Sequence, residues 1–143
     1  MNLLLILLTS LSTMIHKDEP VNIFGEKLES CCTDPLTGYY RDGYCNTSAD
    51  DYGTHVICAV MTQEFLDYTV KMGNDLCTAK PEYNFPGLKP GDGWCLCAIR
   101  WKEAYDAGVA PFVRLESTHI KALKYVKMEE LVEFALKNEN PTK

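Results

Sequence analysis

Two short apolar runs without Asp, Glu, Lys or Arg constrain the fold of this chain more than any other feature. Residues 55–61 read HVICAVM and residues 94–98 read WCLCA. Runs of this length and composition are typical of strands that are covered on both faces. The sequence therefore predicts two buried strands, and we expect residues 94–98 to be a central strand of the sheet.

Each run is followed by a helical pattern. After the first run, Thr62 suits a helix N-cap and Gly73 suits the position just past the helix end. After the second run, Trp101 lies on an apolar helical face and Gly108 closes the helix. Residues 112–116 give a third strand. The strand–helix–strand order predicts that it runs parallel to residues 94–98 as their neighbour.

The remaining patterns complete an α+β fold with a small mixed sheet. Residues 118–124 and 128–138 predict two further helices, which brings the total to about four. The Asp42-Gly43 pair predicts a hairpin turn between apolar flanks. We expect one compact domain over residues 15–143, since a chain of 143 residues is near the commonest size for a single domain.

Residues 1–14 are predicted to be an N-terminal extension outside this domain. The run MNLLLILL is too short to span a bilayer, which takes about 20 residues. It also lacks the Lys or Arg that usually precedes the apolar part of a signal peptide. We therefore favour Met14 as the start, and we expect a chain that begins there to keep its stability. Secretion through residues 1–12 is the alternative.

Charge and cysteine content narrow the partners and the compartment. The net charge is −6 and the sequence pI about 5.0, whereas nucleic-acid binding usually needs a basic stripe. We expect neither nucleic acid nor a membrane as a partner. An odd number of cysteines favours a reducing compartment, and hence the cytoplasm, because seven cannot all pair within the chain. They stand at Cys31, Cys32, Cys45, Cys58, Cys77, Cys95 and Cys97.

The cysteines admit two interpretations. Four of them lie in or beside apolar runs, where a free cysteine packs as a small hydrophobe; they are Cys58, Cys77, Cys95 and Cys97. Cys95 and Cys97 also share one face of their strand, because side chains alternate, and so could join Cys31, Cys45 or Cys58 in a metal or redox site. Plain packing is the favoured interpretation. His55 and Cys58 are an odd number of residues apart, which predicts opposite faces.

Polar residues in loops and at strand ends predict a small-molecule pocket beside the tryptophans. Arginine and lysine would accept an anion, and the aspartates would orient them. Arg100 and His119 each follow the carboxyl end of a predicted strand, so we expect them to meet at one edge of the sheet. Solvated turn charges are the competing interpretation. The candidate ligand-binding residues are Asp34, Arg41, Asp42, Lys89, Asp92, Trp94, Arg100 and His119.

Several long motifs resemble those of the domain of unknown function 2237 family, mostly bacterial proteins. They are CCTDPLTGYYRDGYC (31–45), THVICAVMTQEFLDYTVKMGNDL (54–76), FPGLKPGDGWCLCAIRW (85–101), GVAP (108–111) and LESTH (115–119). The similarity covers about residues 21–137 and implies a small stand-alone protein without an assigned activity. Cysteine is expected in that family at 31, 45, 58, 95 and 97, whereas Cys32 and Cys77 depart from it.

Three hypotheses of function remain open at the level of sequence. The first is a binding protein or small enzyme with an anion-accepting pocket, although the residues assign neither a nucleophile nor a base. The second is a cysteine-based metal or redox site. The third is an interaction domain that uses an exposed aromatic patch of Tyr39, Tyr40, Tyr44 and Tyr83.

Overall fold

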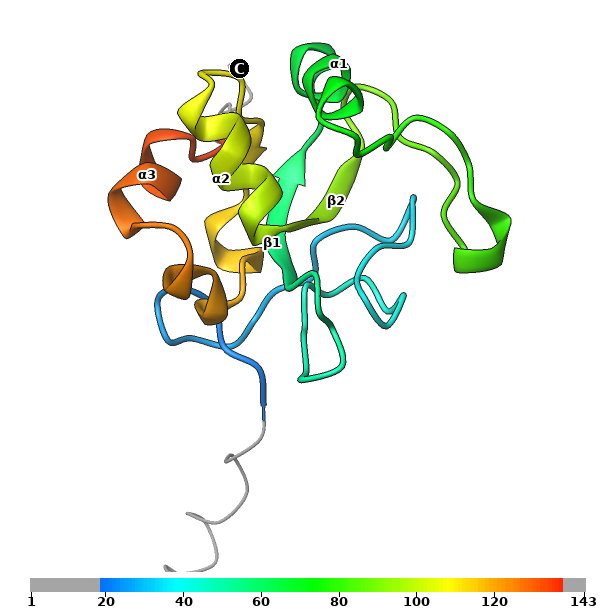
Figure 1. Cartoon of the computed structure of the whole chain (residues 1–143). Coiled ribbons are helices and arrows are strands. Elements are labelled where there is room, and N and C mark those ends of the chain that lie inside the picture. The colour runs from blue at the N-terminus through cyan, green and yellow to red at the C-terminus, as the bar shows by residue number, and fades with distance from the viewer. Residues whose placement is uncertain (1–18, 138–143) are drawn as a thin grey trace, which may run out of the picture.

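The computed structural model of the chain describes residues 19–137. Figure 1 shows a small sheet with helices on one side and irregular chain on the other. The elements, in chain order, are β1 (His55–Val60), α1 (Gln63–Lys71), η1 (Pro81–Tyr83), β2 (Gly93–Cys97), α2 (Ala98–Asp106), β3 (Phe112–Val113), η2 (Leu115–Ser117), η3 (Ile120–Lys124) and α3 (Met128–Glu133); η marks a 3₁₀ helix. None of the described helices is long and apolar enough to cross a membrane.

The three-stranded sheet has the order β2-β1-β3, and β1 pairs antiparallel with both neighbours. The prediction of a mixed sheet is therefore wrong, and so is the central position expected for residues 94–98, because β2 lies at an edge. β2 and β3 do run in the same direction, since each is antiparallel to β1. The prediction that these two strands run in the same direction is therefore correct. They are not neighbours, however, because β1 lies between them.

The helix signals are confirmed where they are local. Thr62 caps α1, and its hydroxyl accepts a hydrogen bond from the Phe65 N–H at 3.1 Å. Gly73 has a φ of +83°, the left-handed conformation that ends helices. The number of helices is lower than predicted: three α-helices are present in the described chain, and residues 120–124 form a 3₁₀ helix. The Asp42-Gly43 turn connects irregular segments rather than strands.

The main hydrophobic core lies between the sheet and the helices. β1 is buried along its middle, and it contributes Val56, Ile57 and Ala59 to this core. Trp101 of α2 is fully buried there, and its indole N–H donates to the Pro111 carbonyl at 3.1 Å. The prediction that residues 55–61 form a strand covered on both faces is confirmed by this burial pattern.

The other face of the sheet is covered by irregular chain. Figure 1 shows the cyan part of the described chain running along that side. Two disulfides fasten it to the strands: Cys31 bonds to Cys58 of β1, and Cys45 bonds to Cys95 of β2. The expectation that Cys58 and Cys95 pack as free small hydrophobes is therefore wrong. Both are buried as predicted, but both are cross-linked.

Three cysteines are free, and they differ in exposure. Cys77 is exposed, against the prediction that it packs as a small hydrophobe, whereas Cys32 and Cys97 are partly exposed. The predicted N-terminal extension, residues 1–14, lies outside the described residues.

We predict that amide hydrogens of β1 exchange most slowly in this protein. β1 is the central strand and is buried on both faces, so its hydrogen bonds open only near the free energy of global unfolding. Hydrogen exchange followed by NMR measures this directly. Slower exchange in α3 than in Val56–Ala59 would contradict the assignment of β1 as the centre of stability.

Candidate functional site

Arg41 is the most unusual charged residue of the fold. It lies in the 38–43 turn with a φ of +53°, a conformation that non-glycine residues seldom adopt. Its guanidinium donates to three backbone carbonyls, those of Gly38, Tyr83 (2.9 Å) and Asn84 (3.2 Å). No carboxylate of the described chain forms an ion pair with it. Burial lowers the pKa of the Arg41 guanidinium.

The guanidinium lies over the ring of Trp94, with its carbon 4.8 Å from the ring centroid. Trp94 is held in turn by an edge-to-face contact with Phe85, at 5.1 Å between centroids. Such a cation–π contact contributes about 0.5–2 kcal/mol. Arg41 and Trp94 line one pocket, bounded by the 38–41 turn, the 74–85 loop and the ends of β1 and β2.

His55 lines the same pocket from the start of β1. Its ring Nδ1 lies 2.6 Å from Oδ1 of Asp51, and the side chain of Asp51 is 0% exposed against 40% for His55. Asp51 also accepts from the His55 backbone N–H at 2.9 Å and from the Thr47 hydroxyl at 3.0 Å. Burial alone would raise the pKa of Asp51, but these hydrogen bonds and the His55 charge lower it overall.

Sequence reasoning missed His55 because it assumed a regular strand. His55 pairs with Cys97, and Cys58 pairs with Cys95. Between these two pairs β1 advances by three residues and β2 by only two, so β1 contains one extra residue. This bulge places His55 and Cys58 on the same face, which corrects the prediction of opposite faces. The Asp51-x-x-x-His55 spacing was the available signal for the pair.

Three predicted residues gather in a second pocket. Asp34, Lys89 and Asp92 line it together, and it shares Asn84 and Phe85 with the Arg41 pocket. Lys89 is already paired there: its Nζ lies 2.9 Å from Oδ1 of Asp92, and its backbone N–H donates to the other carboxylate oxygen at 3.0 Å. The hydrogen bond to Asp92 raises the pKa of Lys89.

The remaining predicted residues line neither of these pockets. Arg100 donates to the Met72 carbonyl at 3.1 Å, at the end of α1. His119 caps η3, where its Nδ1 accepts from the Lys121 N–H at 3.0 Å. Burial and the Lys121 charge lower the pKa of His119. Asp42 accepts from the Tyr44 N–H at 3.0 Å within its own turn.

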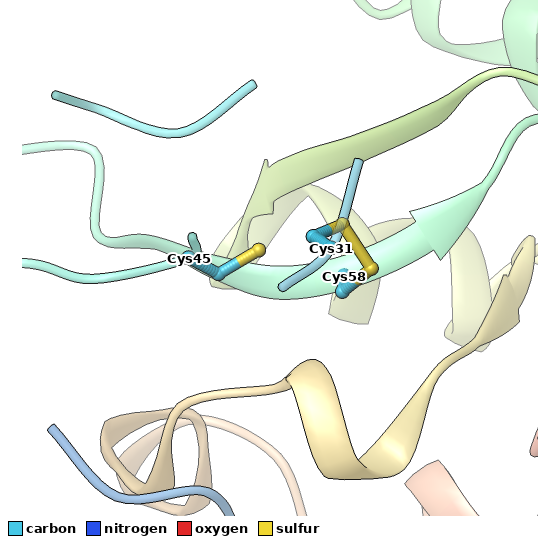
Figure 2. Close-up of side chains that lie close together, drawn as sticks. All are labelled: Cys31, Cys45 and Cys58. Carbon is cyan, nitrogen blue, oxygen red and sulfur yellow. A yellow bond between two sulfur atoms is a disulfide. The ribbon is translucent and has the colours of Figure 1, made fainter. Parts of the chain in front are cut away.

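Four buried cysteines form a cluster, and one of them, Cys95, also lines the Arg41 pocket. The sulfurs of Cys31, Cys45 and Cys58 lie within 4.8 Å of one another, and Cys95 is bonded to Cys45. Figure 2 shows Cys45 beside the Cys31–Cys58 bond on the face of the strands. Cys97 is not part of this cluster, although the sequence grouped it with Cys95.

The fold and the pocket define a small α+β protein whose irregular layer is fastened to an antiparallel sheet by buried cysteines. A family model described as "Uncharacterized protein conserved in bacteria (DUF2237)" matches residues 21–135, and the chain belongs to this family. No curated protein matches the chain.

We predict that Asp51→Asn flattens the acid side of the stability profile. The pKa of Asp51 is lower in the folded chain than in the unfolded one, so its carboxylate stabilises the fold above a pH of about 3.9. That contribution is lost as pH falls through the folded pKa, and the variant lacks it. Urea unfolding between about pH 5 and pH 2 measures the slope. The matched control is Asp50→Asn, at an exposed neighbour, and equal slopes for both variants would contradict the prediction.

Proposed function

We propose that this protein binds a small anionic molecule in the Arg41 pocket. The observation that carries the proposal is the state of Arg41: a partly buried cation whose described partners are neutral carbonyls and an aromatic ring. A guanidinium has five N–H donors, and three are used here, so two remain for a ligand. Carboxylate and phosphate are the anions that this group recognises best.

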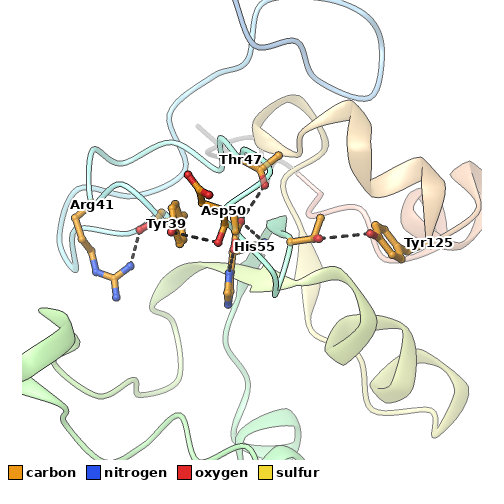
Figure 3. Close-up of polar contacts among 9 residues, drawn as sticks. Tyr39, Arg41, Thr47, Asp50, His55 and Tyr125 are labelled. Carbon is orange, nitrogen blue, oxygen red and sulfur yellow. Dashed lines mark hydrogen bonds and ion pairs between the residues drawn. The ribbon is translucent and has the colours of Figure 1, made fainter.

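The other charges of the pocket support an anion. Lys80 adds a second cation to the lining. Of the two acidic side chains, Asp75 is engaged in its own turn, where it accepts from the Thr78 hydroxyl at 2.6 Å and from the Cys77 and Thr78 N–H groups. Glu82 lies on the rim and is exposed. In Figure 3, the Arg41 guanidinium and the His55 ring extend in the same direction, one from the 38–43 turn and the other from the start of β1.

Aromatic side chains form much of the remaining wall. Tyr39, Tyr40 and Tyr83 line the pocket together with Trp94. Aromatic walls with a few convergent polar groups are the usual make-up of small-molecule sites. We therefore assign these tyrosines to the pocket, in preference to a separate interaction surface.

We predict that Arg41→Gln weakens the binding of anionic ligands. A panel of small carboxylates and phosphates, scanned by thermal shift, identifies a ligand, and calorimetry then gives its Kd. Loss of a hydrogen bond to a charged group costs about 1.5–3 kcal/mol, which is a roughly 10- to 150-fold rise in Kd.

The matched control is Arg100→Gln. Arg100 also donates to a backbone carbonyl, but it does not line this pocket. Its variant should bind with the affinity of the unaltered chain. Equal losses in both variants, or hits that neither variant affects, would contradict an anion site at Arg41.

A second candidate function is a metal or redox site at the four-cysteine cluster. Tetrahedral zinc holds four thiolates with the metal–sulfur distance near 2.3 Å, so neighbouring sulfurs lie ~3.8 Å apart. The spacing of Cys31, Cys45 and Cys58, all within 4.8 Å, is compatible with that geometry. A dithiol reductant would supply two electrons and two protons to each disulfide and become a disulfide itself. This function needs a reducing compartment, and we propose the cytoplasm.

We predict that chain purified with a dithiol and without chelator carries about one equivalent of zinc, as a site of four thiolates requires. Cys45→Ser should lose the metal, whereas Cys77→Ser, at the exposed thiol, should keep it. Elemental analysis measures the content. Metal far below one equivalent in the fully reduced chain would remove this candidate.

A further inference from the structure

The Asp51–His55 pair has the geometry of an oriented base. The buried carboxylate of Asp51 holds Nδ1 of His55 at 2.6 Å. An ionised carboxylate can only accept, so Nδ1 carries the proton and Nε2 is the free, basic nitrogen. The ring packs against Gly53, where an added Cβ would lie 2.3 Å from Cε1 of His55. Only glycine at position 53 leaves room for the ring in this place.

A free thiol lies opposite this histidine. Cys97 ends β2 and is the direct cross-strand partner of His55. Side-chain alternation along β2 places Cys97 on the same face as Cys95, and Cys95 and His55 both line the Arg41 pocket. In a regular antiparallel ladder, cross-strand partners have their Cβ atoms about 4.5–5.5 Å apart, and here the bulge of β1 begins directly after His55. Cys97 is partly exposed and is the N-cap residue of α2, where its side chain makes no capping hydrogen bond.

We propose that Cys97, which does not itself line the Arg41 pocket but pairs with His55 of its wall, is a nucleophile, with His55 as its base and Asp51 as a positioning residue. This rests on the proposed anion site, because Arg41 would hold the charged end of the substrate. The chemistry that fits these groups is acyl transfer from an ester or thioester that carries a carboxylate or phosphate. None of these roles is performed by the buried cysteines, which are already paired with one another.

The reaction balances with the groups present and water. Nε2 of His55 takes the proton of the Cys97 thiol, and the sulfur attacks the carbonyl carbon. The new S–C bond forms, the bond from carbon to the leaving oxygen or sulfur breaks, and His55 returns the proton to the leaving group. Water, deprotonated by the same nitrogen, then attacks the acyl carbon and the S–C bond breaks. The acyl group leaves as an acid, and His55 returns the proton to the Cys97 sulfur. The N-terminus of α2 favours the negative charge that develops beside Cys97.

The described residues include no hydrogen bond between Cys97 and His55, so the pair is open in this state. Catalytic hydrogen bonds often close only when substrate is bound. The reaction requires that the Cys97 sulfur approach Nε2 of His55 when substrate binds. A purely structural Asp51–His55 link would tie the 47–55 loop together and leave the reactivity of Cys97 unchanged. This difference makes the two roles separable by experiment.

The test uses iodoacetamide at pH 7 on the full-length chain, with each thiol followed by peptide mass spectrometry. An ordinary thiol is only a few per cent thiolate at that pH, so Cys97 should react about tenfold faster in the native chain than in the same chain unfolded in urea. Cys77, which is exposed, serves as the internal reference. A native Cys97 that reacts no faster than the unfolded one overturns the proposal.

Variants then assign the roles. His55→Gln and Asp51→Asn should each slow Cys97 and leave Cys77 unchanged, whereas His119→Gln, at the other partly buried histidine of residues 19–137, should change neither. A variant that unfolds would instead speed the labelling of Cys32, which packs against Gly93. The comparison of native and unfolded wild-type chain would then decide by itself. Unchanged Cys97 labelling in a folded His55→Gln overturns the assignment of the base.

Two further probes separate this inference from the anion site. 4-Nitrophenyl acetate should acetylate Cys97 and release one nitrophenolate per chain, and Cys97→Ser should abolish this burst. The absence of acetylation overturns acyl transfer. Iodoacetate should react with Cys97 faster than iodoacetamide does, relative to their rates at Cys77, and Arg41→Gln should remove that preference. A reactive Cys97 without the preference would contradict the anion site and leave the nucleophile supported.

Discussion

Two buried disulfides are the constraint on which the rest of this structure depends. Residues 19–45 form no helix or strand, and the backbone hydrogen bonds that tie them to later segments run to residues 116–120 rather than to the sheet. The Cys31–Cys58 and Cys45–Cys95 bonds close separations of 27 and 50 residues. In the chain-entropy account, loops of that size are worth about 3.5 and 4 kcal/mol. They anchor both ends of the segment between them, and that segment carries Arg41.

The pocket follows from this anchoring. Because the 31–45 segment is fixed at both ends, its turn can hold Arg41 at a φ of +53°, a conformation that costs about 1–3 kcal/mol. In this conformation the guanidinium lies over the ring of Trp94 and donates hydrogen bonds to the carbonyls of residues 83 and 84. Three segments that are remote in sequence thus meet around one cation. On the neighbouring strand end, the buried carboxylate of Asp51 fixes the orientation of the His55 ring.

The sequence predicted that the candidate residues meet, whereas the structure brings some of them together and separates others, for one topological reason. Arg41 and Trp94 were grouped and do line one pocket. Arg100 and His119 were expected to meet because β2 and β3 were taken as neighbours. β1 lies between those strands, which sets them roughly 9–10 Å apart. Arg100 donates a hydrogen bond to the end of α1, whereas His119 accepts one within η3. A rule about adjacent strand ends fails when a third strand intervenes.

What the sequence by itself determined is local: two strands from uncharged apolar runs, and α1 between the Thr62 cap and Gly73. Such features depend on neighbours within a few residues, and these are visible in the chain. Only the tertiary structure decided which cysteines pair and which face His55 occupies. Seven cysteines allow many pairings, and one inserted residue in β1 reverses the side to which His55 points. Both outcomes depend on contacts between segments that are distant in sequence, and the pattern of neighbouring residues does not predict such contacts.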